Sequence, residues 1–165
     1  MHQEQVDREK PDRRWIENHI PHQGTMCLLD RVERWDTQEI VCIARSHADT
    51  NNPLRSAGNL GIATAIEYAA QATAVHSALL IGDGAKLSSG FLTSARNVQW
   101  QCSRLDNLSG EISVRATRLS GNEMTVLYAF EICAAAQTII DGRVSIFLNS
   151  DAAASLANQF EQLPS

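Results

Sequence analysis

A single carboxylate within a long apolar run is the first feature of this sequence that could do chemistry. Glu67 is the only acidic residue between Asn59 and Ile81, a run rich in Ala, Leu and Ile. A buried carboxylate finds hydrogen-bond donors, stays protonated through a raised pKa, or lies at a wet cleft. Thr64 and Gln71 are three and four residues from Glu67 and share its helical face. The alternative is a helix edge that points Glu67 to solvent.

The run from 59 to 81 must position this carboxylate, and it is predicted to be one helix. It contains no proline, and Gly82 follows it as a typical C-terminal stop. Apolar or small residues occur on all of its faces, which is typical of a helix wrapped by other structure.

Strands are predicted on both sides of this helix. Two precede it, at 27–32 and 40–46, and four follow, at 91–100, 111–119, 124–133 and 138–148. Residues 120–122 and 141–142 have the composition of hairpin turns, and residues 15–20 that of a short helical turn ended by Pro21. This order predicts an α+β fold in which a curved antiparallel sheet wraps one long central helix.

We expect a single domain over residues 15–149. A charged, flexible arm is expected over 1–14, and a tail or short helix over 150–165. A sheet around one helix leaves open edges, and pairing across a two-fold axis covers them, so we expect a dimer.

Composition excludes several classes of function. The net charge of -5 and the pI of about 5.5 argue against nucleic-acid binding. No signal peptide is recognisable, and polar residues in the apolar run argue against a membrane span, so we expect a cytoplasmic protein. The four cysteines, Cys27, Cys42, Cys102 and Cys133, lack the spacing of a zinc site or a disulfide framework, and we expect small buried side chains and no metal.

Three segments carry a resemblance to a known family. They are Pro21-His22-x-x-x-Met26-x-Leu28-Leu29-Asp30-Arg31-Val32, Ile66-Glu67-Tyr68-Ala69-Ala70-Gln71-Ala72, and Gly90-Phe91-Leu92. Together they resemble the hot-dog fold 3-hydroxyacyl-[acyl-carrier-protein] dehydratases, with most likeness to the subgroup of aryl-polyene pigment pathways. The likeness runs from about Trp15 to Leu148. Because hot-dog proteins include thioesterases, the fold alone does not determine the reaction.

The resemblance implies how water would be eliminated from a 3-hydroxyacyl thioester. In the family, a His and a helix carboxylate from two protomers act as base and acid, and Glu67 holds the acid position. The family's His lies fourteen residues earlier, where this chain has Pro53. His47 matches if the next loop carries a six-residue insertion, and His22 is the second candidate; we favour His47. His19 and His76 are expected to be surface or hydrogen-bonded residues without a catalytic part.

The resemblance also implies a substrate-binding set and partners. The Pro-Gly pair that usually opens the central helix is replaced by Leu60-Gly61-Ile62. The implied substrate-binding residues are Met26, Thr64, Gln71, Gly61, Ile62, Gly90 and Phe91. The acyl group would be carried on phosphopantetheine, with no other cofactor. An acyl carrier protein would dock on basic residues, for which the candidates are Lys86, Arg96, Arg104, Arg115 and Arg118.

Two other functions stay open at this point. The altered His loop favours an accessory subunit that pairs with a complete hot-dog dehydratase, as a heterodimer in place of a homodimer. An acyl thioesterase would use the same carboxylate to orient water.

Overall fold

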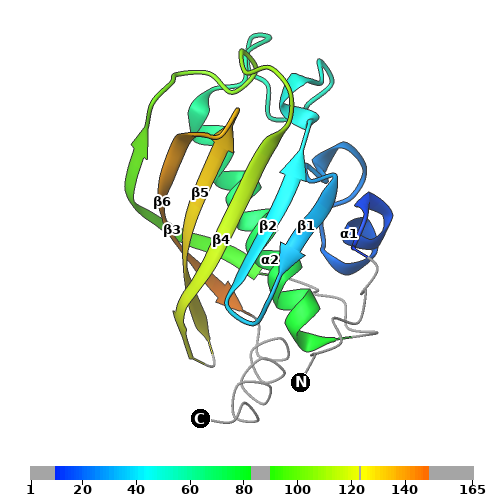
Figure 1. Ribbon diagram of the computed structural model, residues 1–165, viewed down its shortest axis with the longest axis vertical. Coiled ribbons are helices and arrows are strands. Elements are labelled where there is room, and N and C mark those ends of the chain that lie inside the picture. Colours follow the sequence, from blue (N-terminus) through cyan, green and yellow to red (C-terminus); the bar gives the residue numbers. More distant parts are fainter. Residues whose placement is uncertain (1–9, 83–89, 123, 149–165) are drawn as a thin grey trace, which may run out of the picture.

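A six-stranded antiparallel sheet curls around one long helix (Figure 1). The computed structural model describes residues 10–82, 90–122 and 124–148. The helices are α1 (Arg13–His19) and α2 (Ala65–Ile81), with short 3-10 turns η1 (Gly24–Met26), η2 (Ser46–Ala48) and η3 (Ile62–Thr64). The strands are β1 (Arg31–Trp35), β2 (Glu39–Ala44), β3 (Gly90–Trp100), β4 (Ile112–Gly121), β5 (Thr125–Ala134) and β6 (Gln137–Leu148). They lie in the order β1-β2-β4-β5-β6-β3.

The central helix confirms the main prediction from the sequence. Its small residues let it lie in the concave face of the sheet, where Tyr68, Ala72 and Val75 are fully buried. Gly82 ends it at a φ of 94°, donating its N–H to the carbonyl of Ala78. None of the helices in the described ranges is long and apolar enough to cross a membrane.

The helix begins later than predicted, at Ala65 instead of Asn59. Residues just before it pair with the connection between β3 and β4: Leu105 donates its N–H to the carbonyl of Leu60, and Ile62 donates to that of Ser103. These bonds hold the chain at Leu60 and Gly61 out of the helix, and the 3-10 turn η3 then leads into α2.

Two other predictions from the sequence were wrong in detail. The apolar run 27–32 is mostly a buried connection, and β1 starts only at Arg31. Asp141 and Gly142 lie inside β6, where a Cβ on Gly142 would meet Phe130 and Val98 at about 3 Å. The chain reverses instead at Ala135 and Ala136, whose φ angles of 48° and 62° belong to a tight hairpin turn.

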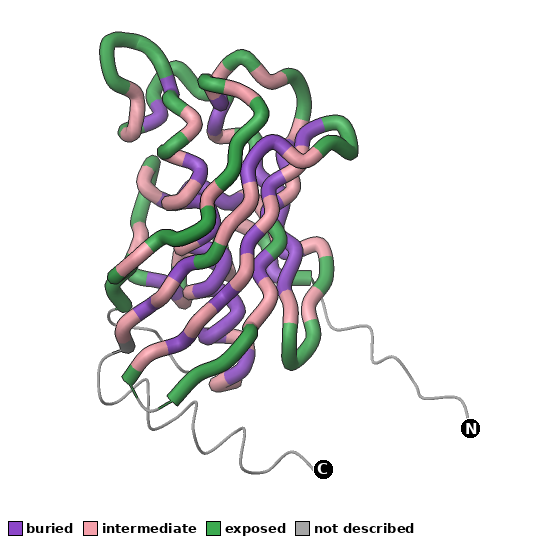
Figure 2. The backbone as a smooth tube through the Cα atoms, turned by 90° about the vertical axis from the view of Figure 1, so that its left-hand side faces the viewer, coloured by how far each residue is buried: buried purple, intermediate pink, exposed green. Residues whose placement is uncertain are grey.

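The two edges of the sheet differ. At the β1 edge, Val32 donates its N–H to the carbonyl of Pro11, and Asp12 forms a bridge with Arg31 and caps α1. The last residues of the arm expected over 1–14 therefore belong to the fold; residues 1–9 and 149–165, including the expected C-terminal tail, lie outside the described residues. The β3 edge is mostly exposed (Figure 2).

A buried polar pair lies between α2 and the sheet. His76 is fully buried, and its Nε2 donates to the carbonyl of Asp36 at 2.8 Å. Its Nδ1 lies 2.9 Å from the hydroxyl of Tyr128. The neutral ring is thus fully satisfied, and burial lowers the pKa of His76 and raises that of Tyr128 to about 12. The ring of His19 stacks on that of Trp15, with the ring centroids 3.8 Å apart.

Stability is therefore expected to fall in mild acid. The unfolded chain takes up a proton at His76 near pH 6.5, whereas the folded chain does so only at lower pH. The contribution of His76 to the free energy of unfolding is therefore complete above pH 6.5 and declines below it. His47 behaves alike, since burial lowers its pKa too. The slope approaches about 1.4 kcal/mol per pH unit per histidine. Urea unfolding between pH 7 and 5 should show a shallower decline in His76→Gln, and equal slopes would contradict this account.

Candidate active site

One pocket runs along α2 from its first turn toward its carboxyl end. Its walls come from α2, from β3, β5 and β6, and from the loop that follows α1. The lining residues are Pro21, His22, Glu67, Ala70, Thr73, Ala74, Ser77, Gly90, Leu92, Val126, Tyr128 and Ile146. The walls are mainly apolar, with His22 and Glu67 both among the lining groups, which suits an apolar ligand that reacts at one point.

His22 and Glu67 form a contact pair in this pocket. The Nε2 atom of His22 lies 3.1 Å from Oε1 of Glu67, and both side chains keep about a quarter to a third of their surface exposed. The Nδ1 atom of His22 is buried and has no hydrogen-bond partner among the described residues. Nε2 is therefore the ring nitrogen that can exchange a proton at this site.

Gln71 holds the carboxylate of Glu67 by a hydrogen bond. Its side chain is fully buried, accepts the N–H of Leu28 at 2.9 Å and donates to the carbonyl of Met26 at 2.7 Å. The same amide nitrogen lies 3.2 Å from Oε1 of Glu67. One side chain thus connects the carboxylate with the segment that follows His22.

The electrostatics of the pair favour an ionised carboxylate. Burial raises the pKa of Glu67, but hydrogen bonds from His22 and Gln71, together with the charge of His22, outweigh burial and lower the pKa overall. Near neutral pH, Glu67 is a proton acceptor. The acid role implied by the resemblance requires Glu67 to take up a proton first.

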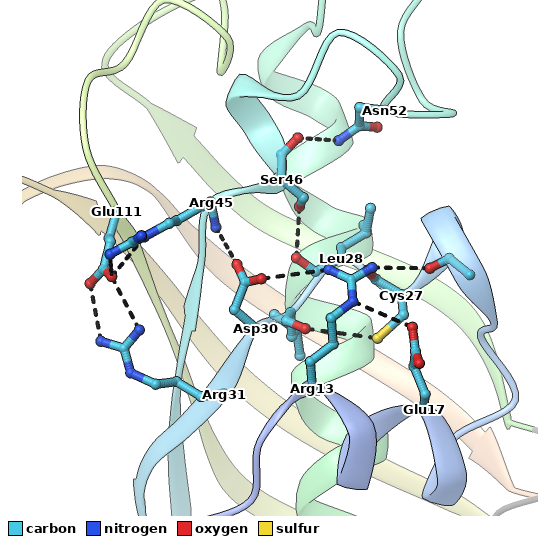
Figure 3. A network of polar contacts seen from close by, with 12 residues as sticks. Arg13, Glu17, Cys27, Leu28, Asp30, Arg31, Arg45, Ser46, Asn52 and Glu111 are labelled. Atoms are coloured by element: carbon cyan, nitrogen blue, oxygen red, sulfur yellow. Dashed lines mark hydrogen bonds and ion pairs between the residues drawn. The ribbon is translucent and has the colours of Figure 1, made fainter.

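A network of polar contacts holds the loop that carries His22 (Figure 3). The Arg13 guanidinium donates to the carbonyls of Gly24 and Cys27 at 3.1 and 2.9 Å and pairs with Asp30 at 3.5 Å. Gln23 donates to two carbonyls at the end of α1. These bonds fix the loop at both ends, so the position of His22 is set by the fold.

His47, the base that the sequence favoured, occupies a different environment. It lies in η2, is fully buried, and its Nε2 donates to the carbonyl of Leu108 at 3.2 Å. Its Nδ1 has no partner in the part of the chain that the structure describes, and His47 does not line the pocket with Glu67. Burial lowers its pKa. A catalytic role for His47 stays a prediction.

The other residues implied as substrate-binding are spread over several positions. Gly90 lines the pocket, and Phe91 beside it is 61% exposed. Thr64 donates its hydroxyl to the carbonyl of Gly61, at the turn before α2. Ile62 uses its N–H to bond Ser103. Gln71 donates to the backbone carbonyl of Met26, and neither residue is among the lining residues of this pocket.

Several lining residues were not singled out from the sequence. Ala70, Ala74 and Ser77 follow Glu67 at the spacing of one helix face, a signal that the sequence already contained. Val126 and Tyr128 share one face of β5 through its clean alternation. That this face meets the Glu67 face of α2 depends on strand order, which the sequence alone does not reveal.

The comparisons with known proteins fit this geometry. No curated protein matches the chain. Among solved structures, the dehydratase heterocomplex ApeI:P from Xenorhabdus doucetiae is similar at 22% identity and a TM-score of 0.72, covering 87% of this chain and 97% of that chain. A mutant thioesterase from Pseudomonas aeruginosa follows at 15% identity and a TM-score of 0.51, over 72% of this chain and 79% of that one.

These likenesses confirm the hot-dog fold expected from the sequence. The family model that matches residues 14–157 is ApeP-like, described as ApeP dehydratase, and it spans most of the chain. The chain therefore belongs to the ApeP-like dehydratase family.

Proposed function

We propose that this protein removes water from a 3-hydroxyacyl thioester carried on the phosphopantetheine arm of an acyl carrier protein, giving the trans-2-enoyl thioester. The observation that carries the proposal is the His22–Glu67 pair, 3.1 Å apart in a mainly apolar pocket. Family membership supports a dehydration over other reactions of the hot-dog fold.

Dehydration moves one proton from C2 to the departing hydroxyl, so the site needs one base and one acid. Ionised Glu67 takes the C2 proton while the C2–H electrons form the C2=C3 bond. The C3–O bond breaks, and protonated His22 supplies the proton that makes the leaving group water. Proton exchange with solvent after product release restores the pair. These roles reverse the order implied by the resemblance; the two donors on Oε1 of Glu67, which lower its pKa, support an ionised carboxylate.

The pocket suits an acyl chain. Ala70, Ala74, Val126 and Ile146 provide apolar walls beyond the reacting pair. The small alanines on α2 leave room for the chain along the helix. Burial of such a chain would supply binding energy that holds C2 and C3 beside Glu67.

The basic residues expected to bind a carrier protein are partly neutralised by acidic neighbours. Arg104 pairs with Asp106, and Arg115 shares a shallow groove with Glu131 and Asp141. Arg96 is exposed on β3, and Lys86 lies outside the described residues. We propose Arg96 as the docking cation, because it lies on the strand whose first residues line the pocket.

Turnover of a 3-hydroxyacyl carrier-protein substrate, followed by intact mass for the loss of water, tests the reaction. We expect Glu67→Gln and His22→Ala to lower the rate by about 10²- to 10⁴-fold, because each removes one proton-transfer group. His19→Ala is the matched control, since His19 stacks on Trp15 and should leave the rate within about twofold.

Three outcomes would contradict parts of this assignment. Loss of activity in folded His47→Ala, with His22→Ala active, would return the base to His47. Release of free thiol without loss of water would indicate a thioesterase. The protein would be an accessory subunit if it is inert alone and if an active complex with a partner keeps its rate when His22 and Glu67 of this chain are varied.

The open β3 edge supports assembly with a second hot-dog subunit, either another copy or a partner dehydratase. The similar Xenorhabdus doucetiae structure is a dehydratase heterocomplex, ApeI:P. Phe91, Leu92 and Trp100 on β3 are 61%, 41% and 59% exposed, an unusual amount of apolar surface for one strand. We propose that β3 pairs with the corresponding edge of the second subunit.

Charges on this strand should therefore weaken assembly. Trp100→Glu is expected to lower the association constant at least tenfold, because it places a carboxylate in an apolar contact. Light scattering after gel filtration measures the change. Leu119→Glu is the control, since Leu119 is 46% exposed on β4, away from the β3 edge. Equal effects of both variants would rule out the β3 interface.

A further inference from the structure

We propose that Gln71 is a positioning residue that gives the two oxygens of Glu67 separate roles: Oε1 is held by the protein, and Oε2 is left to take the substrate's C2 proton. This inference rests on the proposed function and names the reacting atom of that site. It also removes Gln71 from the substrate-binding set implied by the sequence.

The orientation of the Gln71 amide is fixed by two backbone groups of opposite character. The N–H of Leu28 can only donate, so it must face the amide oxygen, and the carbonyl of Met26 can only accept, so it must face the amide nitrogen. The second hydrogen on that nitrogen then points to Glu67. Since the side chain is fully buried, water does not compete for these bonds.

Both recorded contacts of the Glu67 carboxylate fall on the same atom. His22 Nε2 and Gln71 Nε2 lie 3.1 and 3.2 Å from Oε1. Oε2 has no recorded partner within the described residues, and the side chain keeps about 30% of its surface exposed in a residue that lines the pocket. Two donors on Oε1 hold the plane of the carboxylate, which otherwise turns freely about its last bond. The oxygen left without a donor is the better proton acceptor.

Gln71 also couples the carboxylate to the histidine. Met26 and Leu28 lie on the segment that begins at Pro21 and carries His22, while Gln71 lies one helical turn after Glu67. A shift of this segment would therefore pull on the amide that orients Glu67. The His22–Glu67 pair keeps its geometry because the buried side chain of Gln71 is bonded both to Glu67 and to the segment that carries His22.

The test compares Gln71→Glu and Gln71→Met with the wild type. Gln71→Glu keeps an acceptor for Leu28 but loses the amide donor, and Gln71→Met keeps only the length of the side chain. We expect kcat to fall about tenfold or more, with KM within about twofold, because the carboxylate is misaligned while the pocket is intact. The acidic limb of the pH profile should move to higher pH, because Glu67 loses a hydrogen bond that lowers its pKa.

Gln23→Met is the matched control. Gln23 belongs to the same loop and makes two hydrogen bonds to backbone carbonyls, but it has no recorded contact with Glu67 among the described residues. It should leave the acidic limb in place. A merely structural role for Gln71 predicts that Gln71→Met and Gln23→Met both lower stability and that neither moves that limb.

A second measurement separates this inference from the proposed reaction. NMR titration of the Glu67 carboxyl carbon needs no substrate, with Glu67→Gln identifying the signal. If the pKa of Glu67 is higher in folded Gln71→Met than in the wild type, the inference is supported even if no dehydration is found. An unchanged Glu67 titration in both Gln71 variants would overturn it, even in an enzyme that dehydrates its substrate normally.

Discussion

The structure depends on one constraint: a helix that is apolar on nearly every side must be enclosed, yet it carries a carboxylate in its first turn. The sheet supplies the enclosure, and Tyr68, Ala72 and Val75 are fully buried. Glu67 escapes full burial only because the pocket reaches it. Its charge is stabilised by two donors, one from the helix and one from the loop after α1. The fold and the site are thus consequences of the same sequence of α2.

The helix, the number of strands and the class of fold could be predicted from the sequence because each leaves a local trace. The end of α2 follows from Gly82, and the alternation in β5 follows from its residue types. The wrong turn at Asp141-Gly142 shows the limit of such traces. Gly142 is there because Phe130 and Val98 approach the backbone closely, which is a property of neighbouring strands and not of the local sequence.

In the candidate site, too, one residue could be predicted from the local sequence and its partner could not. Glu67 stood out by its type, whereas its partner could not be chosen by sequence spacing. His47 and His22 are 20 and 45 residues before Glu67, and neither distance says which ring reaches the carboxylate. The structure places His22 beside it through the course of the loop after α1, which Arg13 holds by its bonds to Gly24 and Cys27. Contacts over such separations are decided by packing.

The difference between the two sheet edges limits how large an assembly can grow. Pro11 and Asp12 contact Val32 and Arg31, so the start of the β1 edge is occupied by the chain itself. Within the described residues, a third subunit could not pair with the start of β1 without displacing these contacts. A pair joined through β3, as proposed above, would therefore present at each outer end a β1 strand whose first residues are already bonded to the segment before α1.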